Sequence, residues 1–186
     1  GYLFHFPFMP DELRLQTHNC LYPANLYKGI FWQPNPKLIY LGMQDQYFTF
    51  NMFDAQAWYA RDVIMGDIEL PDLAAREADE QKWLATYAKC LTVSDSIDFQ
   101  AAYIRDLTNA TDYPEFAVEK QGEILKEWQK DKAENIMTFR EKAYSSTLTG
   151  TMSPELPEPW LDILDDSLEH FLNLTFVKPK KRKKVA

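Results

Sequence analysis

The sequence predicts an α/β fold that is rich in helix, and three observations lead to this prediction. Short runs of aromatic and β-branched residues between turn formers occur at 2–6, 26–32 and 38–41, as is typical of strands. Apolar residues at helical spacing then recur from residue 51 to residue 171. The 186 residues are 46% hydrophobic and 15% aromatic, which is enough for the core of one ordinary domain.

A strand, a loop and a helix are expected in that order within residues 38–66. Leu38 to Leu41 is a short apolar run that Gly42 closes, and it has the length of a buried strand. After a polar and aromatic loop, Asn51 is a residue type that caps helices. The helix is expected to end at Gly66, because glycine is favoured just past a helix end.

The loop of this unit is a candidate ligand site. A helix N-terminus directs backbone N–H groups and a partial positive charge toward the loop, which suits an anionic or electron-rich group. In open α/β sheets ligands bind beyond the carboxyl ends of strands, so Gln44, Asp45, Gln46 and Thr49 are candidate contacts. No phosphate-binding glycine fingerprint accompanies the loop, so the pattern alone also fits a plain scaffold.

Further helices are expected after residue 72. Amphipathic patterns cover Ala74 to Leu91, a second helix that Ser94 caps, and a third that begins near Val118 and continues to about Tyr144. A last amphipathic helix is expected at 160–171, after a proline-rich loop.

Several strings in the chain are long and unusual. They are GMQDQ at 42–46 with the segment 50–66 that follows, the opening residues 1–8, and the segments 112–114, 134–140 and 149–154. In this order they resemble the bacterial flavin-containing monooxygenases, most closely those that oxygenate trimethylamine. The resemblance extends from residue 1 to about residue 173.

This resemblance implies how the chain is organised. Residues 1–71 would return from an NADPH-binding domain and complete an FAD-binding Rossmann-type domain with a few short strands. Residues 72–173 would form a helical C-terminal region, and residues 174–186 a basic, disordered tail. The family's glycine-rich motifs for FAD and NADPH are absent from these 186 residues. We therefore expect the C-terminal portion of an enzyme, inactive without its N-terminal part.

The resemblance also implies an activity. NADPH reduces the FAD, the reduced flavin reacts with O₂ to a C4a-hydroperoxide, and trimethylamine takes one oxygen to become its N-oxide. Methylated sulfides or indole would meet the same oxidant. No metal is implied, and a homodimer is possible through the helical region.

Six residues match functional positions of the family. Asp45 matches an acid beside the flavin and nicotinamide, and Trp128 an aromatic residue at the substrate pocket, where its indole suits an alkylated ammonium. Gln44, Gln46 and Thr49 match positions that face the flavin, and Arg140 matches one near the NADP phosphates. The residues alone leave other interpretations open: Asp45 as a turn cap, Trp128 as core, and Arg140 as a surface charge.

Composition narrows the classes of partner. The formal net charge is −8, and without the six positive residues within 178–184 it is −14, so the body repels nucleic acid. The cysteines, Cys20 and Cys90, lie far apart and indicate neither a disulfide framework nor a zinc site. No apolar run approaches the roughly 20 residues of a membrane-spanning helix. We expect a cytoplasmic protein without membrane or nucleic-acid partners.

Two alternatives from other classes stay open on the sequence. The first is a non-catalytic, acidic helical module that docks on a nucleotide-binding partner. The second is a nucleic-acid binder that uses the basic tail at 178–184, which would give sequence-independent and salt-sensitive binding.

Overall fold

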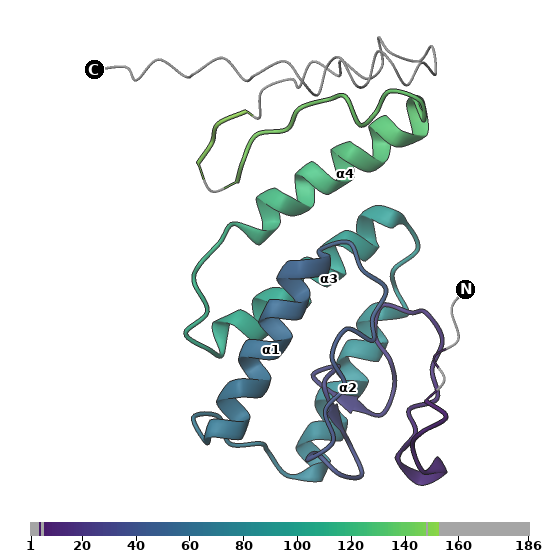
Figure 1. The fold of residues 1–186 in the computed structure, drawn as a ribbon, viewed down its shortest axis with the longest axis vertical. Coiled ribbons are helices and arrows are strands. Elements are labelled where there is room, and N and C mark those ends of the chain that lie inside the picture. The colour runs from purple at the N-terminus through teal and green to yellow at the C-terminus, as the bar shows by residue number, and fades with distance from the viewer. Residues whose placement is uncertain (1–3, 5, 148, 153–186) are drawn as a thin grey trace, which may run out of the picture.

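The computed structural model describes residues 4, 6–147 and 149–152 (Figure 1). The expected helix at 160–171, the basic tail and most of the expected strand at 2–6 lie outside the described residues. The described elements are a 3₁₀ turn at Asp11–Leu13, strands β1 (Leu26–Tyr27) and β2 (Phe31–Trp32), and helices α1 (Thr49–Met65), α2 (Leu73–Tyr87), α3 (Val93–Asn109) and α4 (Val118–Glu134). Within this part of the chain, no helix combines the length and the apolar character that crossing a membrane requires.

Helix α3 occupies the centre of the fold. It packs against α1, α2 and α4, while the β1–β2 hairpin packs against α2 (Figure 1). The apolar face of α3 is buried. Ile97, Ile104 and Leu107, which lie on this face at helical spacing, are each 0% exposed. The prediction of a helix-rich fold with few strands is confirmed.

Aromatic side chains fill the core between α2, α3 and the segment before the hairpin. Tyr22 stacks on Trp83 at 6.0 Å between ring centroids, and Phe99 and Tyr103 meet Trp83 edge-on at 5.4 and 5.7 Å. Residues from both sides of position 72 therefore share one core. The division of the chain at that position stays a prediction.

The hairpin turns tightly at Lys28 and Gly29, which both have positive φ angles, 53° and 63°. The strands pair antiparallel, with Leu26 opposite Trp32 and Tyr27 opposite Phe31. Positive φ at two successive residues is the geometry of hairpin turns that match strand twist. The expected single strand at 26–32 is thus two short strands around a turn.

We expect Gly29→Ala to lower the free energy of unfolding by about 2 kcal/mol. A left-handed backbone costs a non-glycine residue about 1–2 kcal/mol, and the added Cβ would lie 2.2 Å from Nε2 of the buried Gln44. Urea denaturation measures the change. Gly66→Ala is the matched control, because its φ is also positive, 85°, but its Cβ would meet no atom within 4 Å. Equal losses in the two variants would show that backbone strain alone is responsible.

The expected buried strand at Leu38–Leu41 is wrong. Ile39 forms a single antiparallel bridge to Phe31. The last hydrogen bond of this pairing runs from the N–H of Tyr40 to the carbonyl of Ile30, at 2.9 Å. Leu41 is 45% exposed and Gly42 has a φ of 72°. The chain therefore leaves the hairpin after one bridge, because a partner strand for Leu41 is absent from the described residues.

The helix following this segment begins earlier than the sequence indicates. Helix α1 starts at Thr49 with Phe48 as N-cap, and Phe48 gives no side-chain cap. Asn51 lies inside the first turn, where its Oδ1 accepts a hydrogen bond from Gln121 of α4 at 3.0 Å. The predicted end is confirmed, since Gly66 closes the helix in the left-handed conformation.

Three later helix boundaries also differ from expectation. Helix α2 ends at Tyr87 rather than at Leu91. Thr92, not Ser94, caps α3. Its side chain accepts the backbone N–H of Asp95, and the Asp95 side chain accepts the backbone N–H of Thr92, which is a capping box. Helix α4 starts at Val118 as predicted but ends at Glu134. Its apolar pattern continues to Phe139, which is buried from a turn rather than from the helix.

Candidate functional site

The four candidate contacts of the sequence lie around one pocket. Its volume is about 350 Å³, and it is lined by Phe4, Asn19, Gly42, Gln44, Asp45, Gln46 and Thr49. The segment from Gly42 to Tyr47, which we call the 42–47 loop, forms most of its wall and leads directly into α1. The structure thus brings together the residues that the loop position predicted.

These residues present different groups to the pocket. Gln44 is 2% exposed, and its Oε1 accepts a hydrogen bond from Gln56 of α1 at 2.8 Å, so its amide is directed into the fold. Asp45 is exposed, and its carboxylate accepts the backbone N–H of Gln46 at 3.0 Å. The side chain of Gln46 donates to the carbonyl of Gly42 at 3.3 Å. Asp45 is therefore the accessible charge of the loop.

The N-terminus of α1 adds backbone donors at the pocket edge. The first hydrogen bond into the helix comes from the N–H of Met52 to the carbonyl of Phe48, at 2.9 Å. The N–H groups of Thr49, Phe50 and Asn51 precede it, and Phe48 provides no capping side chain. Since Thr49 also lines the pocket, this end of α1 suits a hydrogen-bond acceptor on a ligand.

Groups near the loop stay uncharged at neutral pH. Burial, and then the Asp45 carboxylate, raise the pKa of the Tyr47 phenol, with Ser96 opposing the shift. Burial raises the pKa of the Cys20 thiol, and a hydrogen bond with Thr17 partly offsets it. Neither group lines the pocket, whose polar lining residues other than Asp45, namely Asn19, Gln44, Gln46 and Thr49, are themselves neutral. Such a wall favours carboxamide, hydroxyl and ring N–H groups over phosphate.

Trp128 and Arg140 lie together, but they do not line this pocket. Trp128 is half-buried on α4 and meets Phe139 edge-on at 5.2 Å. Arg140 is exposed, with its guanidinium 4.7 Å from the centroid of the same Phe139 ring, and Lys132 lies 5.3 Å from the Trp128 ring. The substrate role of Trp128 and the NADP role of Arg140 stay predictions.

A larger pocket of about 510 Å³ also borders the start of α1. It is lined by residues from α1, the α3–α4 connection, α4 and the 145–147 segment: Asn51, Tyr113, Pro114, Glu115, Phe116, Gln121, Ile124, Ser145, Ser146 and Thr147. The sequence did not single it out, because its walls come from four separate segments.

Sequence reasoning also missed two glutamines that contact the loop. Gln56 of α1 and Gln100 of α3 are both 0% exposed, although glutamine is rarely buried completely. Their position in the sequence could have identified them, because each glutamine lies within the apolar face of an amphipathic helix. A polar residue there is expected to have a buried hydrogen-bonding partner.

Comparison with known proteins finds relatives that are monooxygenases. No family model matches this chain. It is 58% identical over 173 residues to the trimethylamine monooxygenase of Methylocella silvestris, covering 93% of this chain and 38% of that protein. A flavin-containing monooxygenase of Aspergillus flavus is 37% identical over 82 residues, covering 38% of this chain and 17% of that protein.

A solved structure supports the same relationship. The crystal structure of Tmm from Pelagibacter sp. strain HTCC7211 matches with a TM-score of 0.84 and 48% sequence identity, covering 92% of this chain and 39% of that chain. The chain thus spans about two fifths of the length of the relatives it matches. The resemblance found in the sequence is confirmed: this chain is a homologue of the trimethylamine monooxygenases, within the flavin-containing monooxygenases.

Proposed function

We propose that this chain supplies one wall of the cofactor site of an FAD- and NADPH-dependent monooxygenase that converts trimethylamine to its N-oxide. One observation carries the proposal: Gln44, Asp45, Gln46 and Thr49, each of which matches a flavin-facing or nicotinamide-facing position of the family by sequence, line one pocket at the start of α1. Relatives that match 93% of this chain are trimethylamine monooxygenases.

The pocket fits the ring end of the cofactors better than their phosphates. Its wall offers the hydroxyl of Thr49, the amide of Gln46 and the backbone donors of α1, which can bond the carbonyl and nitrogen atoms of an isoalloxazine. The Asp45 carboxylate can accept a hydrogen bond from a nicotinamide carboxamide or a ribose hydroxyl. The chain lacks a glycine-rich phosphate loop, so the pyrophosphates would be bound by polypeptide from the remaining length of the relatives.

The residues of this chain would position the cofactors and the substrate and shield them from water, while the cofactor would supply the redox chemistry. When bound, reduced flavin would supply the two electrons with which O₂ gives one oxygen atom to the substrate nitrogen and the other to water. Trp128 would hold the alkylated ammonium by cation–π attraction, and Arg140 would bind NADP phosphate oxygens as a bidentate donor. Both groups lie around Phe139, which gives these two roles a common structural support.

A joined protein tests this proposal. This chain would be fused to the part of the Methylocella silvestris relative that it does not match, and NADPH oxidation and N-oxide formation would be followed with trimethylamine. We expect amine-dependent turnover in the fusion. We expect no flavin binding by the chain alone, because the phosphate-binding loops are absent. A folded, flavin-loaded fusion that no amine or sulfide stimulates would contradict the proposal.

Replacing the loop carboxylate should weaken this activity. We expect Asp45→Ala to reduce amine-dependent turnover of the fusion by about tenfold, the effect of one lost hydrogen bond to a charged group of about 1.4 kcal/mol. Asp54→Asn is the matched control, because Asp54 is an exposed acid of α1 outside the pocket. A similar loss in both variants would indicate a general charge effect instead.

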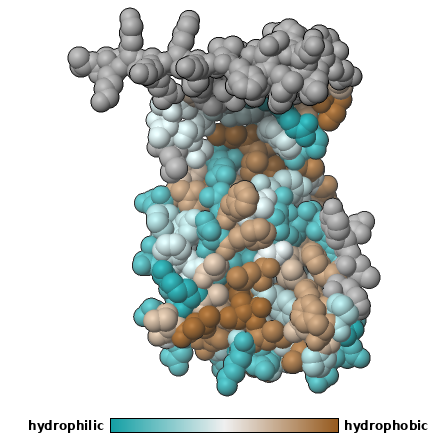
Figure 2. Space-filling model, viewed as in Figure 1, coloured by the Kyte–Doolittle hydropathy of each residue, from teal (hydrophilic) through white to brown (hydrophobic). Residues whose placement is uncertain are grey.

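A second candidate, a non-catalytic module that docks on a nucleotide-binding partner, is favoured by an exposed apolar face of α1. Figure 2 shows hydrophobic side chains gathered over the face on which α1 lies in Figure 1. Leu41, Ile64 and Met65 are 45, 70 and 71% exposed and line one groove. Tight binding to the unmatched part of a relative, without turnover in the fusion, would identify this function.

A further inference from the structure

The 42–47 loop is fixed by side chains rather than by a sheet. The Oε1 atom of Gln56 accepts the N–H of Gly42 at 2.8 Å, and its Nε2 donates to Oε1 of Gln44 and to the hydroxyl of Tyr103, both at 2.8 Å. A backbone N–H can only donate, so this bond fixes which end of the Gln56 amide is oxygen. Tyr103 in turn donates to the carbonyl of Lys28 in the hairpin turn at 2.7 Å.

Gln100 holds the other end of the loop in the same way. Its Oε1 accepts the N–H of Tyr47 at 2.7 Å, and its Nε2 donates to the carbonyl of Asp45. These two bonds bracket Gln46, so a single amide fixes the backbone on both sides of that residue. The N–H of Asp45 is held independently by the carbonyl of Cys20, at 2.7 Å.

Gln56 and Gln100 come from the two helices that pack against each other beneath the loop, α1 and α3. Because neither amide is exposed, water does not compete for these bonds, and each is stronger than a comparable surface bond. Releasing the loop would leave buried amide groups without partners. The packing of α1 on α3 therefore sets the conformation of a loop that belongs to neither helix.

We propose that Gln56 and Gln100 are the positioning residues of the pocket: they fix the 42–47 loop, and through it the placement of Asp45 and Gln46 against a bound cofactor. Neither glutamine lines the pocket itself. The part concerning the cofactor rests on the proposed function, whereas the part concerning the loop does not. Such supporting groups decide whether a site has its productive geometry.

Amide hydrogen exchange of this chain tests the loop part. We expect Gln100→Leu to accelerate exchange at Tyr47, and Gln56→Leu at Gly42, each by about tenfold or more, the factor that corresponds to about 1.4 kcal/mol. Gln33→Leu is the matched control. It removes another buried glutamine, whose Nε2 bonds Glu80 at 2.9 Å away from the loop, so overall stability should fall while both loop amides stay protected.

Gln100→Glu separates positioning from packing, because it keeps the volume of the side chain. Above its pKa the carboxylate can accept the Tyr47 N–H but cannot donate to the Asp45 carbonyl. Below that pKa, which burial and the carbonyl acceptor raise, the protonated carboxyl group can donate again. Protection of Tyr47, corrected for intrinsic exchange, should therefore recover on acidification. The same recovery is not expected in Gln100→Leu.

The outcomes separate the two parts of the proposal. Unchanged exchange at Gly42 and Tyr47 in folded Gln56 and Gln100 variants, or no recovery of Gln100→Glu at low pH, would overturn it. In the fusion described above, we expect Gln100→Leu to weaken FAD binding by about tenfold while Gln33→Leu does not. Released loop amides with unchanged FAD binding would support the positioning of the loop and overturn the assignment of its pocket to flavin.

Discussion

Raising the pH above about 10 is expected to unfold the protein cooperatively, because three buried phenols resist ionisation. Burial raises the pKa values of Tyr22, Tyr59 and Tyr103 well above their ordinary value. In the unfolded chain the same groups ionise near pH 10. Above that pH the unfolded state holds fewer protons than the native state, so stability falls as the pH rises.

The size of this effect follows from proton linkage. Each such tyrosine lowers the free energy of unfolding by about 1.4 kcal/mol per pH unit, or about 4 kcal/mol for three together. A domain of ordinary stability, about 5–15 kcal/mol, is then lost within a few pH units. The stabilisation is complete below about pH 10 and disappears toward the raised native pKa values.

Urea denaturation at a series of alkaline pH values measures this slope, and tyrosinate absorbance shows when the phenols ionise. In Tyr59→Phe, the slope of the free energy of unfolding against pH should be smaller by about 1.4 kcal/mol per pH unit than in the unsubstituted protein, because one ionisable phenol is removed. Tyrosinate absorbance that rises near pH 10 in the still-folded protein would contradict the prediction.

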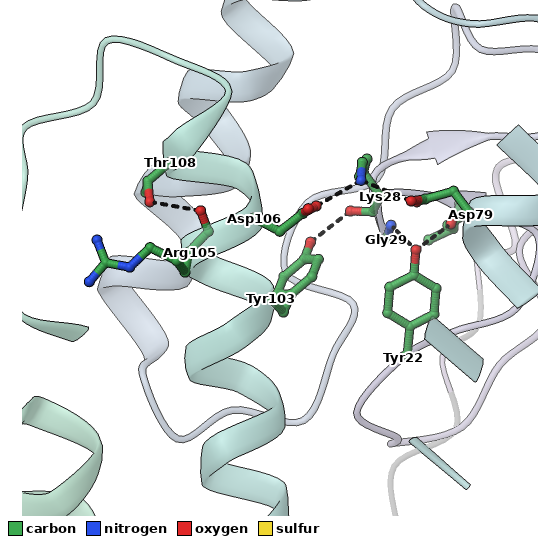
Figure 3. A network of polar contacts seen from close by, with 9 residues as sticks. Tyr22, Lys28, Gly29, Asp79, Tyr103, Arg105, Asp106 and Thr108 are labelled. Carbon is green, nitrogen blue, oxygen red and sulfur yellow. Dashed lines mark hydrogen bonds and ion pairs between the residues drawn. The ribbon is translucent and has the colours of Figure 1, made fainter. Parts of the chain in front are cut away.

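Lys28→Met is expected to lower the free energy of unfolding by about 3 kcal/mol at neutral pH. The Lys28 ammonium lies between Asp79 of α2 and Asp106 of α3, at 3.1 and 2.7 Å, and only 12% of its side chain is exposed (Figure 3). Methionine keeps the apolar stem but removes the charge, which leaves two carboxylates facing each other beside the core.

The pH dependence of this variant has a defined sign. Burial by itself lowers the pKa of Lys28, but the hydrogen bonds and charges of Asp106 and Asp79 outweigh burial and raise it. The ion pairs of Lys28 with Asp79 and Asp106 therefore stabilise the native state fully below the ordinary lysine pKa. This stabilisation is lost as the pH rises through the raised pKa of Lys28. In Lys28→Met, acidification that protonates the two aspartates should reduce the deficit.

Two further variants control for this interpretation. Adding Asp79→Asn and Asp106→Asn to Lys28→Met should recover most of the loss, because no unpaired charge remains. Lys130→Met removes an exposed pair with Glu134, whose atoms lie 3.9 Å apart, and should cost less than about 1 kcal/mol. A deficit in Lys28→Met that the aspartate changes leave intact would assign the effect to packing.

The sequence by itself determined the helix-rich class and the chemical character of the candidate loop. Helical spacing and capping residues are local signals, so the glycine that ends α1 and the start of α4 were found correctly. The strings around residues 42–66 led to the family and to four residues that line one pocket, because residues within six consecutive positions, 44–49, lie close together whatever the fold.

Only the tertiary structure decided how that loop is held. Gln44 lines the pocket, but its amide is directed into the fold because Gln56, twelve residues away along the chain, bonds its oxygen. Gln100 reaches Tyr47 from another helix, across 53 residues. Such bonds depend on how α1 packs on α3, which periodicity does not specify. The pairing of residues 38–41 was misjudged for the same reason, since a strand needs a partner and composition does not reveal one.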